Sequence, residues 1–340
     1  MTRRPRPRAK RTGVMGRSRV ISAVIVLAFF IASVTALVLI PGRRQPDGES
    51  TTVILGRGEG VLAIGRDLAR AHVVGSGLVF ALVAEATGSA PRLKAGEYDF
   101  PSGASLFHVL RMIREGLVVR HFITIPEGLS SKAAAEILRQ SDVLTGPAPV
   151  APEGALLPET YEVSRGESRA AVTQRMERDR NALLEKLWAT RESGLPYRRP
   201  EDAVILASVV EKETALAAER PLVAGVFVNR LENGMRLESD PTVIYALTGG
   251  APLGHGLTRS ELASPSPYNT YRVAGLPPTP INNPGRAALA AVLAPTRTDD
   301  LYFVANGAGG HAFSPTFAQH ARNVAHWRRV ERAAASGANR

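Results

Sequence analysis

The sequence predicts an α+β protein in which a single N-terminal transmembrane helix is followed by two modest domains. Three observations predict this class. An uncharged run of 21 residues covers 20–40. A short strand, a glycine turn and an amphipathic helix recur in that order between 51 and 141. Helical patterns, loops and one further strand then follow as far as residue 330, and a chain of 340 residues has room for all of these parts.

Residues 20–40 have the length and composition of a membrane-spanning helix, because about 20 apolar residues cross a bilayer core. The segment 1–19 carries eight Lys or Arg, which predicts a cytoplasmic N-terminus by the positive-inside rule. The alternative is a signal peptide cleaved at 34–36, but the apolar run continues to Ile40, which favours an uncleaved anchor. Either alternative places 45–340 outside the cytoplasm, and in a cell with two membranes the body would be periplasmic.

The charge of the chain is concentrated at its N-terminus. The formal net charge is +11, yet residues 1–44 hold ten Lys or Arg and no Asp or Glu. The remaining 45–340 therefore hold 32 basic and 31 acidic residues, which argues against nucleic acid as a partner of the body. The chain has no cysteine, which excludes disulfides and thiol chemistry.

A linker at 41–50 precedes the first domain, which we expect at 51–140. Three strand–helix units are predicted, at 51–74, 95–116 and 121–141, with Gly or Ser where each helix should begin. Units of this kind suit a compact α+β module. The pattern alone says nothing about chemistry and favours a packing or spacer domain.

The second domain is expected at 141–330, and its last residues, 331–340, are expected to be frayed. Its predicted elements are a polar helix at 170–192, a helix at 205–216, a helix that begins at Pro221 and ends at Asn233 and Gly234, a Pro-started helix or turn at 238–247, a loop-rich stretch at 249–286, a helix at 286–293 and a strand at 301–306.

The helix at 205–216 carries one glutamate on its apolar face. At 100° per residue, Glu213 falls among the apolar residues of the stripe and Glu211 points roughly 140° away from Leu206, toward the wetter side. The stripe consists of Leu206, Val209, Val210, Leu216 and Ala217. A carboxylate on a buried face is costly unless it is paired or used.

Two roles for Glu213 follow from this position. It is either the ion-pair partner of Arg220 or Arg230, or a general acid whose pKa is raised by apolar surroundings. A hydrolysing glycosidase would need a second carboxylate, and the candidates are Glu219 and Asp240.

The loop-rich stretch offers aromatic faces and a planar amide, the mixture that binds sugars. Its candidates are Tyr268, Asn269 and Tyr271, and the alternative is a rigid proline-rich loop whose tyrosines pack inward. Other chemistries have little support, because HExxH, GxxxxGK[ST] and GxSxG motifs are all missing from the sequence. The spacing of nine between His311 and His320 is weak for zinc, so no metal and no cofactor is expected.

Several segments together resemble the MltG (YceG-like) family of endolytic murein transglycosylases. They are ASVVEKETALAAERPLVAGVFVNRLENGMRLESDPTVIYAL, SPYNTYRVAGLPPTPINNPG, LYFVANGAGGHAFSPTFAQH, LKAGEYDF, ITIPEG and LLPETYEV, and they cover about 51–327. Thr279 stands where the family commonly has Gly.

The resemblance implies an inner-membrane protein with a LysM-like subdomain at 51–140 and a mixed α/β catalytic domain at 141–330. It implies cleavage of nascent peptidoglycan between N-acetylmuramic acid (MurNAc) and N-acetylglucosamine (GlcNAc), with 1,6-anhydro-MurNAc ends and termination of strand elongation. The catalytic residue of the family's E-K-E-T motif falls on Glu213. One glutamate suffices, because the C6 hydroxyl of MurNAc replaces water as the nucleophile.

The sequence therefore predicts a lytic transglycosylase in which Glu213 is acid and then base. The expected substrate-binding residues are Asp240, Tyr268, Asn269, Tyr271 and His311. Peptidoglycan synthases are possible partners by resemblance only. The rival hypothesis is a non-catalytic wall-binding scaffold for these synthases.

Overall fold

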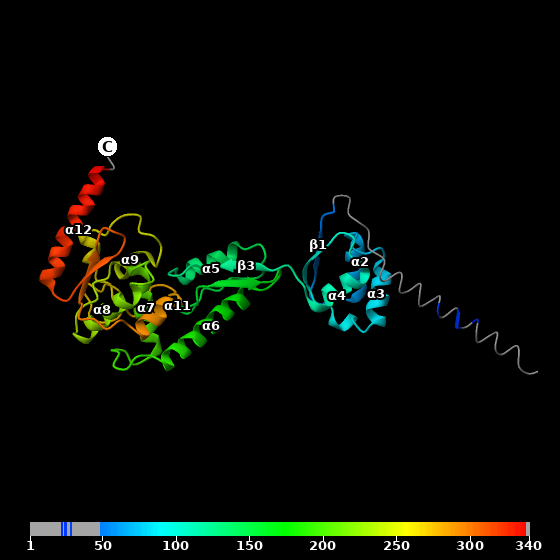
Figure 1. Cartoon of the computed structure of the whole chain (residues 1–340), viewed down its shortest axis with the longest axis horizontal. Helices are drawn as coiled ribbons and strands as arrows, with labels where there is room; N and C mark the ends of the chain where they lie inside the picture. Colours follow the sequence, from blue (N-terminus) through cyan, green and yellow to red (C-terminus); the bar gives the residue numbers. More distant parts are fainter. Residues whose placement is uncertain (1–21, 23, 26–27, 29–47, 338–340) are drawn as a thin grey trace, which may run out of the picture. The chain divides into compact units, whose positions relative to one another are not determined.

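The computed structural model describes residues 22, 24–25, 28 and 48–337. The predicted basic tail, nearly all of the predicted transmembrane helix and most of the linker lie outside the described residues. Among the residues that are described, no helix is both long enough and apolar enough to span a bilayer. The chain divides at Arg120 and His121 into two compact units, which are described separately below (Figure 1).

Over residues 48–120, the first unit consists of one small sheet and three α-helices. Its sheet pairs β1 with β2 antiparallel, with Val53 opposite Tyr98. Tyr98 is fully buried, as are Leu68 and Phe80. The elements are β1 (Thr51–Leu55), α2 (Val61–Arg70), α3 (Gly77–Ala86), the 3₁₀ turn η1 (Ala90–Arg92), β2 (Gly96–Phe100) and α4 (Leu106–Glu115).

Helices α2 and α3 touch through their backbones. A Cβ atom added at Gly65 would lie 2.4 Å from the carbonyl oxygen of Gly77. Only glycine permits so close an approach, so these two positions fix how the helices pack.

The second unit begins with a two-stranded sheet and two helices. Strands β3 and β4 pair antiparallel, with Ile123 opposite Tyr161, over a core that includes Leu138 and Met176. The elements are β3 (His121–Thr124), α5 (Ser131–Gln140), β4 (Thr160–Val163) and α6 (Arg169–Ala189).

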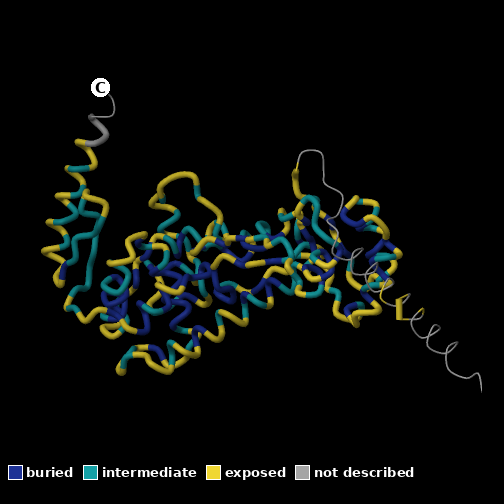
Figure 2. The backbone as a smooth tube through the Cα atoms, turned by 45° about the vertical axis from the view of Figure 1, so that its right-hand side comes forward, coloured by how far each residue is buried: buried dark blue, intermediate teal, exposed yellow. Residues whose placement is uncertain are grey.

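The rest of the second unit is a helical core with a hairpin beside it. Helices α7, α8 and α11 contribute most of one apolar cluster, and Figure 2 shows buried backbone in the interior of this unit. The elements are α7 (Pro200–Glu213), α8 (Arg220–Glu232), α9 (Asp240–Thr248), α10 (Arg259–Leu262), α11 (Arg286–Leu293), β5 (Tyr302–Ala305), β6 (His311–Ser314) and α12 (Phe317–Gly337).

The mixed α+β class and the three strand–helix units are confirmed. The third unit differs in its location. Its strand β3 pairs with β4, so it belongs to the second compact unit rather than to a subdomain at 51–140. Residues 331–337, which were expected to be frayed, are the last residues of α12.

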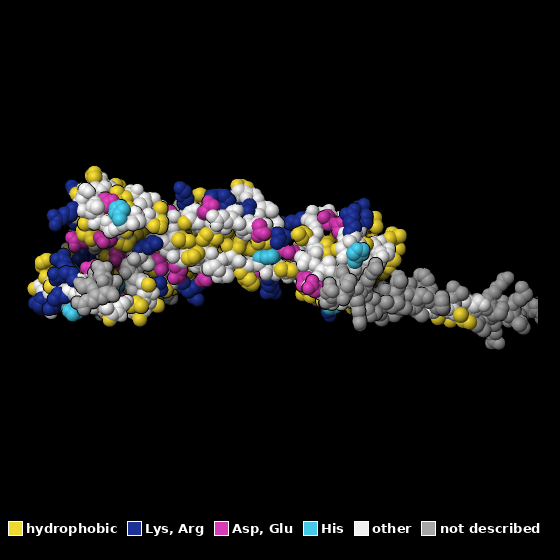
Figure 3. All heavy atoms as spheres, turned by 90° about the horizontal axis from the view of Figure 1, so that it is seen from above, with side chains coloured by type: hydrophobic (Ala, Val, Ile, Leu, Met, Phe, Trp, Pro, Cys, Tyr) yellow, Lys and Arg dark blue, Asp and Glu magenta, His cyan; other side chains and the backbone are white. Residues whose placement is uncertain are grey.

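The surface of the two units carries charges of both signs. Figure 3 shows Lys and Arg interspersed with Asp and Glu on the face that it presents. This distribution agrees with the near-neutral composition of 45–340.

Candidate active site

Glu213 is the last residue of α7. The helix ends because Thr214 is extended, with φ −142° and ψ 133°, and its hydroxyl accepts a hydrogen bond from the backbone N–H of Leu216 at 3.0 Å. Glu213 thus projects from a helix C-terminus, where the helix dipole disfavours negative charge. The prediction that the helix continues through Leu216 is wrong, and Leu216 is 43% exposed.

A small polar cluster surrounds the Glu213 carboxylate. The hydroxyl of Ser239 donates a hydrogen bond to its Oε1. Asp240 follows Ser239 at the start of α9, and its Oδ1 accepts a hydrogen bond of 2.6 Å from the hydroxyl of Tyr271. Three segments distant in sequence therefore meet at Glu213.

The surroundings of Glu213 favour its protonated form. Desolvation by burial raises the pKa of Glu213 to about 7; the Ser239 hydrogen bond lowers it and the charge of Asp240 raises it further. No basic side chain lies within 4 Å of Glu213 in the described part of the chain. An unpaired carboxyl with a pKa near neutrality can donate and then accept a proton.

The two arginines considered as partners of Glu213 are engaged elsewhere. Arg220 pairs with Glu211 at 3.3 Å and approaches Glu127 at 3.6 Å. Arg230 pairs with Glu238 at 3.1 Å. It also donates to the backbone carbonyls of Arg236, Leu237 and Leu301. It thereby holds the segment that leads to Ser239.

Glu211 is the structural glutamate of α7, and the prediction that it faces the wetter side is wrong. Its side chain is 5% exposed, and its Oε2 accepts a hydrogen bond of 2.9 Å from the backbone N–H of Gly285. The reason is that α7 lies between other elements, with every residue from 203 to 210 buried. A helix enclosed on all sides has no wet face for periodicity to identify.

Glu219 and His311 form a separate pair beside the end of α7. The Nδ1 of His311 lies 2.7 Å from Oε2 of Glu219, and its backbone N–H donates to Oε1 at 2.9 Å. Burial acts to raise the pKa of Glu219, but the hydrogen bonds from His311 outweigh it and the pKa is lowered. The Glu219 carboxylate is thus paired with His311. Of the two carboxylates considered as a second catalytic group, only Asp240 belongs to the polar cluster at Glu213.

His311 influences Glu213 through its charge, which lowers the pKa of the glutamate. The hairpin β5–β6 positions it, and its ring packs edge-on against Phe303.

Asn269 is fully buried, and its side-chain amide forms hydrogen bonds within its own loop. Its Nδ2 donates to the carbonyls of Leu262 and Ser264 at 2.9 and 2.8 Å, and its Oδ1 accepts from the backbone N–H of Tyr271 at 3.0 Å. Its contribution is therefore to hold Tyr271 in place, and its amide has no free donor for a sugar.

Tyr268 packs partly inward. Its ring lies 5.1 Å from that of Tyr245, and its hydroxyl is 2.8 Å from the hydroxyl of Thr279. Of the three loop residues, Tyr271 is the one joined to the Glu213 cluster.

Sequence reasoning missed Ser239. A serine before Asp-Pro is the signal of a helix N-cap, and Ser239 does occupy the N-cap of α9. Its side chain makes no capping hydrogen bond, because the hydroxyl is turned to Glu213 instead.

Two hollows are lined by residues of this cluster or by their chain neighbours. A cavity of about 710 Å³ is lined in part by Lys212, Tyr245 and Pro241, so it includes the chain neighbours of Glu213 and Asp240. A shallower hollow of about 520 Å³ is lined by Tyr271. Within the described residues no group of three or more His, Asp or Glu is arranged to hold a metal ion.

Comparison with known proteins places the chain in a family. The sequence profile of the YceG-like family matches residues 53–326. The endolytic murein transglycosylase of Streptococcus pneumoniae serotype 2 (strain D39) is 28% identical over 323 residues, which cover 81% of this chain and 58% of that protein. The endolytic murein transglycosylase of Bacillus subtilis (strain 168) is 36% identical over 171 residues, which cover 49% of this chain and 46% of that protein.

A solved structure is similar as well. The 2.6 Å crystal structure of a yceG-like protein from Listeria monocytogenes has a TM-score of 0.50 and 26% identity, and the match covers 81% of this chain and 98% of that one. The chain spans 58% of the length of the pneumococcal relatives. Because the family profile matches most of its length, the chain belongs to the YceG-like family.

Proposed function

We propose that this protein is an endolytic lytic transglycosylase that cuts peptidoglycan glycan strands between MurNAc and GlcNAc. The observation that carries the proposal is the Glu213 carboxyl, unpaired, hydrogen-bonded by Ser239 and set beside Asp240 and Tyr271. The names of its relatives support the same activity.

The reaction requires one group that gives and then takes a proton. Protonated Glu213 donates to the glycosidic oxygen, and the bond from C1 of MurNAc to that oxygen breaks. The C6 hydroxyl of the same MurNAc attacks C1, and its proton passes to the Glu213 carboxylate. The products are a GlcNAc hydroxyl and a 1,6-anhydro-MurNAc end, and Glu213 is protonated again. A carboxyl with a pKa near 7 suits both steps.

Asp240 and Tyr271 have a supporting role in this proposal. The Asp240 charge favours protonation of Glu213, and Tyr271 fixes the Asp240 carboxylate. The cavity of about 710 Å³ beside Lys212 and Pro241 is within the size range of ligand sites, and it would receive part of the strand.

The cellular setting is part of the proposal. The run at 20–40 and the basic residues before it support a single-pass anchor in the inner membrane, with the N-terminus in the cytoplasm and the body in the periplasm. The strand–helix–helix–strand order of the first unit is compatible with a LysM-like module. Peptidoglycan synthases are proposed partners through the family resemblance alone.

The test is digestion of newly polymerised peptidoglycan strands by the full chain, with Glu213→Gln as the variant and Glu232→Gln as the control. Glu232 lies exposed at the end of α8. We expect 1,6-anhydro ends by mass spectrometry from wild type and control, and at least a hundredfold loss in Glu213→Gln, the size expected when a general acid is removed.

Other products would change the conclusion. Reducing ends would indicate a hydrolase, with Asp240 as the second carboxylate beside Glu213. Strand binding by folded protein without any new ends would favour the non-catalytic scaffold.

A further inference from the structure

The hollow of about 520 Å³ beside Tyr271 has an unusual charge. Its lining consists of Arg236, Arg259, Leu262, Ala263, Tyr271 and Arg272. Three guanidinium groups thus converge on it, and this lining, all of it in described segments, contains no carboxylate. Such a hollow favours an anionic ligand.

Two of the three arginines are held in place by the backbone. Arg236 Nη1 donates to the carbonyl of Tyr271 at 3.0 Å, and Arg272 Nη1 donates to the carbonyl of Ala263 at 3.1 Å. A guanidinium carries five N–H donors, so each side chain keeps donors for a ligand. Across residues 48–337 none of the three, Arg259 included, has an ion-pair partner within 4 Å.

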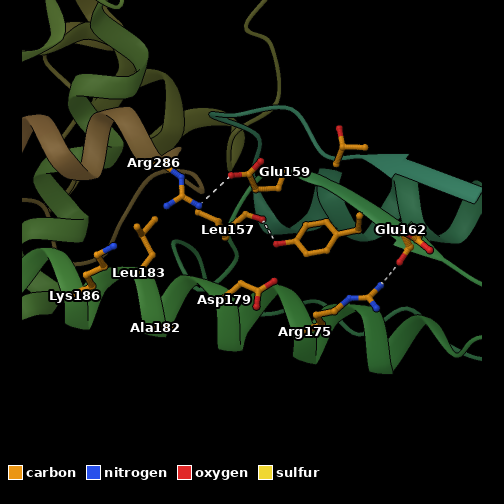
Figure 4. A pocket seen from close by; sticks show the side chains of 11 residues that line it. Leu157, Glu159, Glu162, Arg175, Asp179, Ala182, Leu183, Lys186 and Arg286 are labelled. Atoms are coloured by element: carbon orange, nitrogen blue, oxygen red, sulfur yellow. Dashed lines mark hydrogen bonds and ion pairs between the residues drawn. The ribbon is translucent and has the colours of Figure 1, made fainter.

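A second hollow of the same unit has a different charge distribution and serves as a comparison. The hollow of about 610 Å³ in Figure 4 lies between β4, α6 and the start of α11. Its charges are balanced, with three acidic and three basic side chains in Glu159, Glu162, Asp179, Arg175, Lys186 and Arg286. Arg286 pairs with Glu159 at 3.4 Å. In the Tyr271 hollow, by contrast, no lining carboxylate balances the three arginines.

The arginine hollow and the Glu213 cluster share Tyr271. Tyr271 lines the hollow and donates its hydroxyl to Asp240, which acts on the pKa of Glu213. The hollow is therefore close enough to Glu213 for one long ligand to contact both.

We propose that Arg236, Arg259 and Arg272 bind the free carboxylates of the peptides carried by the glycan strand. This inference rests on the proposed function. The sugar rings of the strand are uncharged, and its negative charge is on the peptide substituents of MurNAc. Guanidinium groups bind carboxylates through paired N–H donors. The enzyme would thus prefer strands whose peptides keep their carboxylates.

Binding by full-length Glu213→Gln protein tests the inference without cleavage of the probe. The probes are a GlcNAc–MurNAc tetrasaccharide with peptides that have free carboxylates, and the same molecule with those carboxylates amidated. We expect isothermal titration to show about tenfold tighter binding of the free acid, and less difference at high salt.

Substitutions of the arginines test whether the preference depends on their positive charge or on the shape of the hollow. The double variant Arg259→Gln/Arg272→Gln, which keeps only Arg236, should lose most of the difference between the probes, and Arg259→Lys should retain more of it. The matched control, Arg286→Gln in the charge-balanced hollow of Figure 4, should keep the full tenfold preference. Thermal unfolding of each variant confirms that it is folded.

Three results would overturn the inference. They are equal binding of both probes by the parent protein, an undiminished preference in the double variant, and an arginine dependence seen only with vesicles that contain phosphatidylglycerol. Failure of the proposed function gives a different result, because the wild-type enzyme would then make no anhydro ends while the carboxylate preference persisted.

Discussion

Glu211 and Glu213 are two residues apart in one helix and have different surroundings. Burial raises the pKa of both. Glu211 has Arg220 and the backbone N–H of Gly285 as partners, which is a structural arrangement. Glu213 has one hydroxyl partner and the repulsion of Asp240, so it keeps a proton that it can transfer.

The raised pKa of Glu213 predicts a pH-dependent stability. A carboxyl whose pKa is higher in the folded state binds its proton more tightly there, so folding is favoured below the ordinary value of 4.5. This contribution should be lost as pH rises from 4.5 through about 7, and the loss should be about 3 kcal/mol. Urea unfolding of wild type and Glu213→Gln across this range measures it, because the variant lacks the titrating group.

The Glu213 carboxyl should also limit the pH range in which the enzyme is active. The kcat/KM for strand cleavage should fall about tenfold per pH unit above pH 7 as the acid form disappears. A kcat/KM that stays constant from pH 6 to 9 would contradict the role of Glu213 as the acid. Equal pH dependence of unfolding in wild type and Glu213→Gln would contradict its raised pKa.

At the residue scale, sequence reasoning identified Glu213 and misjudged its neighbours. Helical phase placed Glu213 inside, but it also placed Glu211 outside. Helical phase can identify a single buried face, but α7 is buried on all sides over residues 203–210. The partner Ser239 is 26 residues away, and nothing in the local sequence of α7 indicates it.

At the scale of elements, the site is built from a helix end, a helix start and a loop. The start of α9 is tied to the loop by Thr242 and Thr270, whose hydroxyls lie 2.9 Å apart, and Thr270 also accepts from the N–H of Ser239 at 3.0 Å. These hydrogen bonds fix Ser239 and Tyr271 relative to each other, so the loop determines the geometry of the cluster.

Asn269→Ala should destabilise the fold. The change leaves the part-buried carbonyls of Leu262 and Ser264 without their donor, which should cost about 2 kcal/mol in the free energy of unfolding. The control Asn233→Ala removes an exposed amide at the end of α8 and should cost under about 1 kcal/mol. Urea denaturation compares the two. If Asn269→Ala lost turnover at unchanged stability, the sugar-binding role predicted from the sequence would be correct after all.

Elements with clear local signals were predicted well. The helix at 286–293 has the predicted bounds, and α8 ends at Glu232 before Asn233. The end of α7 was missed because Thr214, Ala215 and Leu216 continue the helical pattern. The Thr214 hydroxyl accepts from the N–H of Leu216 and donates to Glu219 where the helix ends. Apolar periodicity does not report local side-chain hydrogen bonds of this kind.

At the scale of the whole molecule, each compact unit has an apolar core of its own. Leu68 is fully buried in the cluster of the first unit, and Leu206 is fully buried in the helical cluster of the second. The sequence predicted two domains from composition and pattern. It could not place the third strand–helix unit, because the pairing of β3 with β4 joins residues about 40 positions apart.

Separate cores predict separate responses to cavity mutations. Leu68→Ala removes buried apolar volume from the first unit alone and should lower its free energy of unfolding by about 2–5 kcal/mol. Leu206→Ala should do the same in the second unit. Hydrogen exchange followed by mass spectrometry reports each unit in the intact chain, so Leu68→Ala should speed exchange in α2, α3 and α4 and leave α7 and α11 protected. Strand cleavage by the Leu68→Ala protein should retain the kcat of wild type, because Glu213 and its partners belong to the other core. Faster exchange in both units after either change would mean that they unfold as one, and catalysis would then depend on the stability of the whole chain.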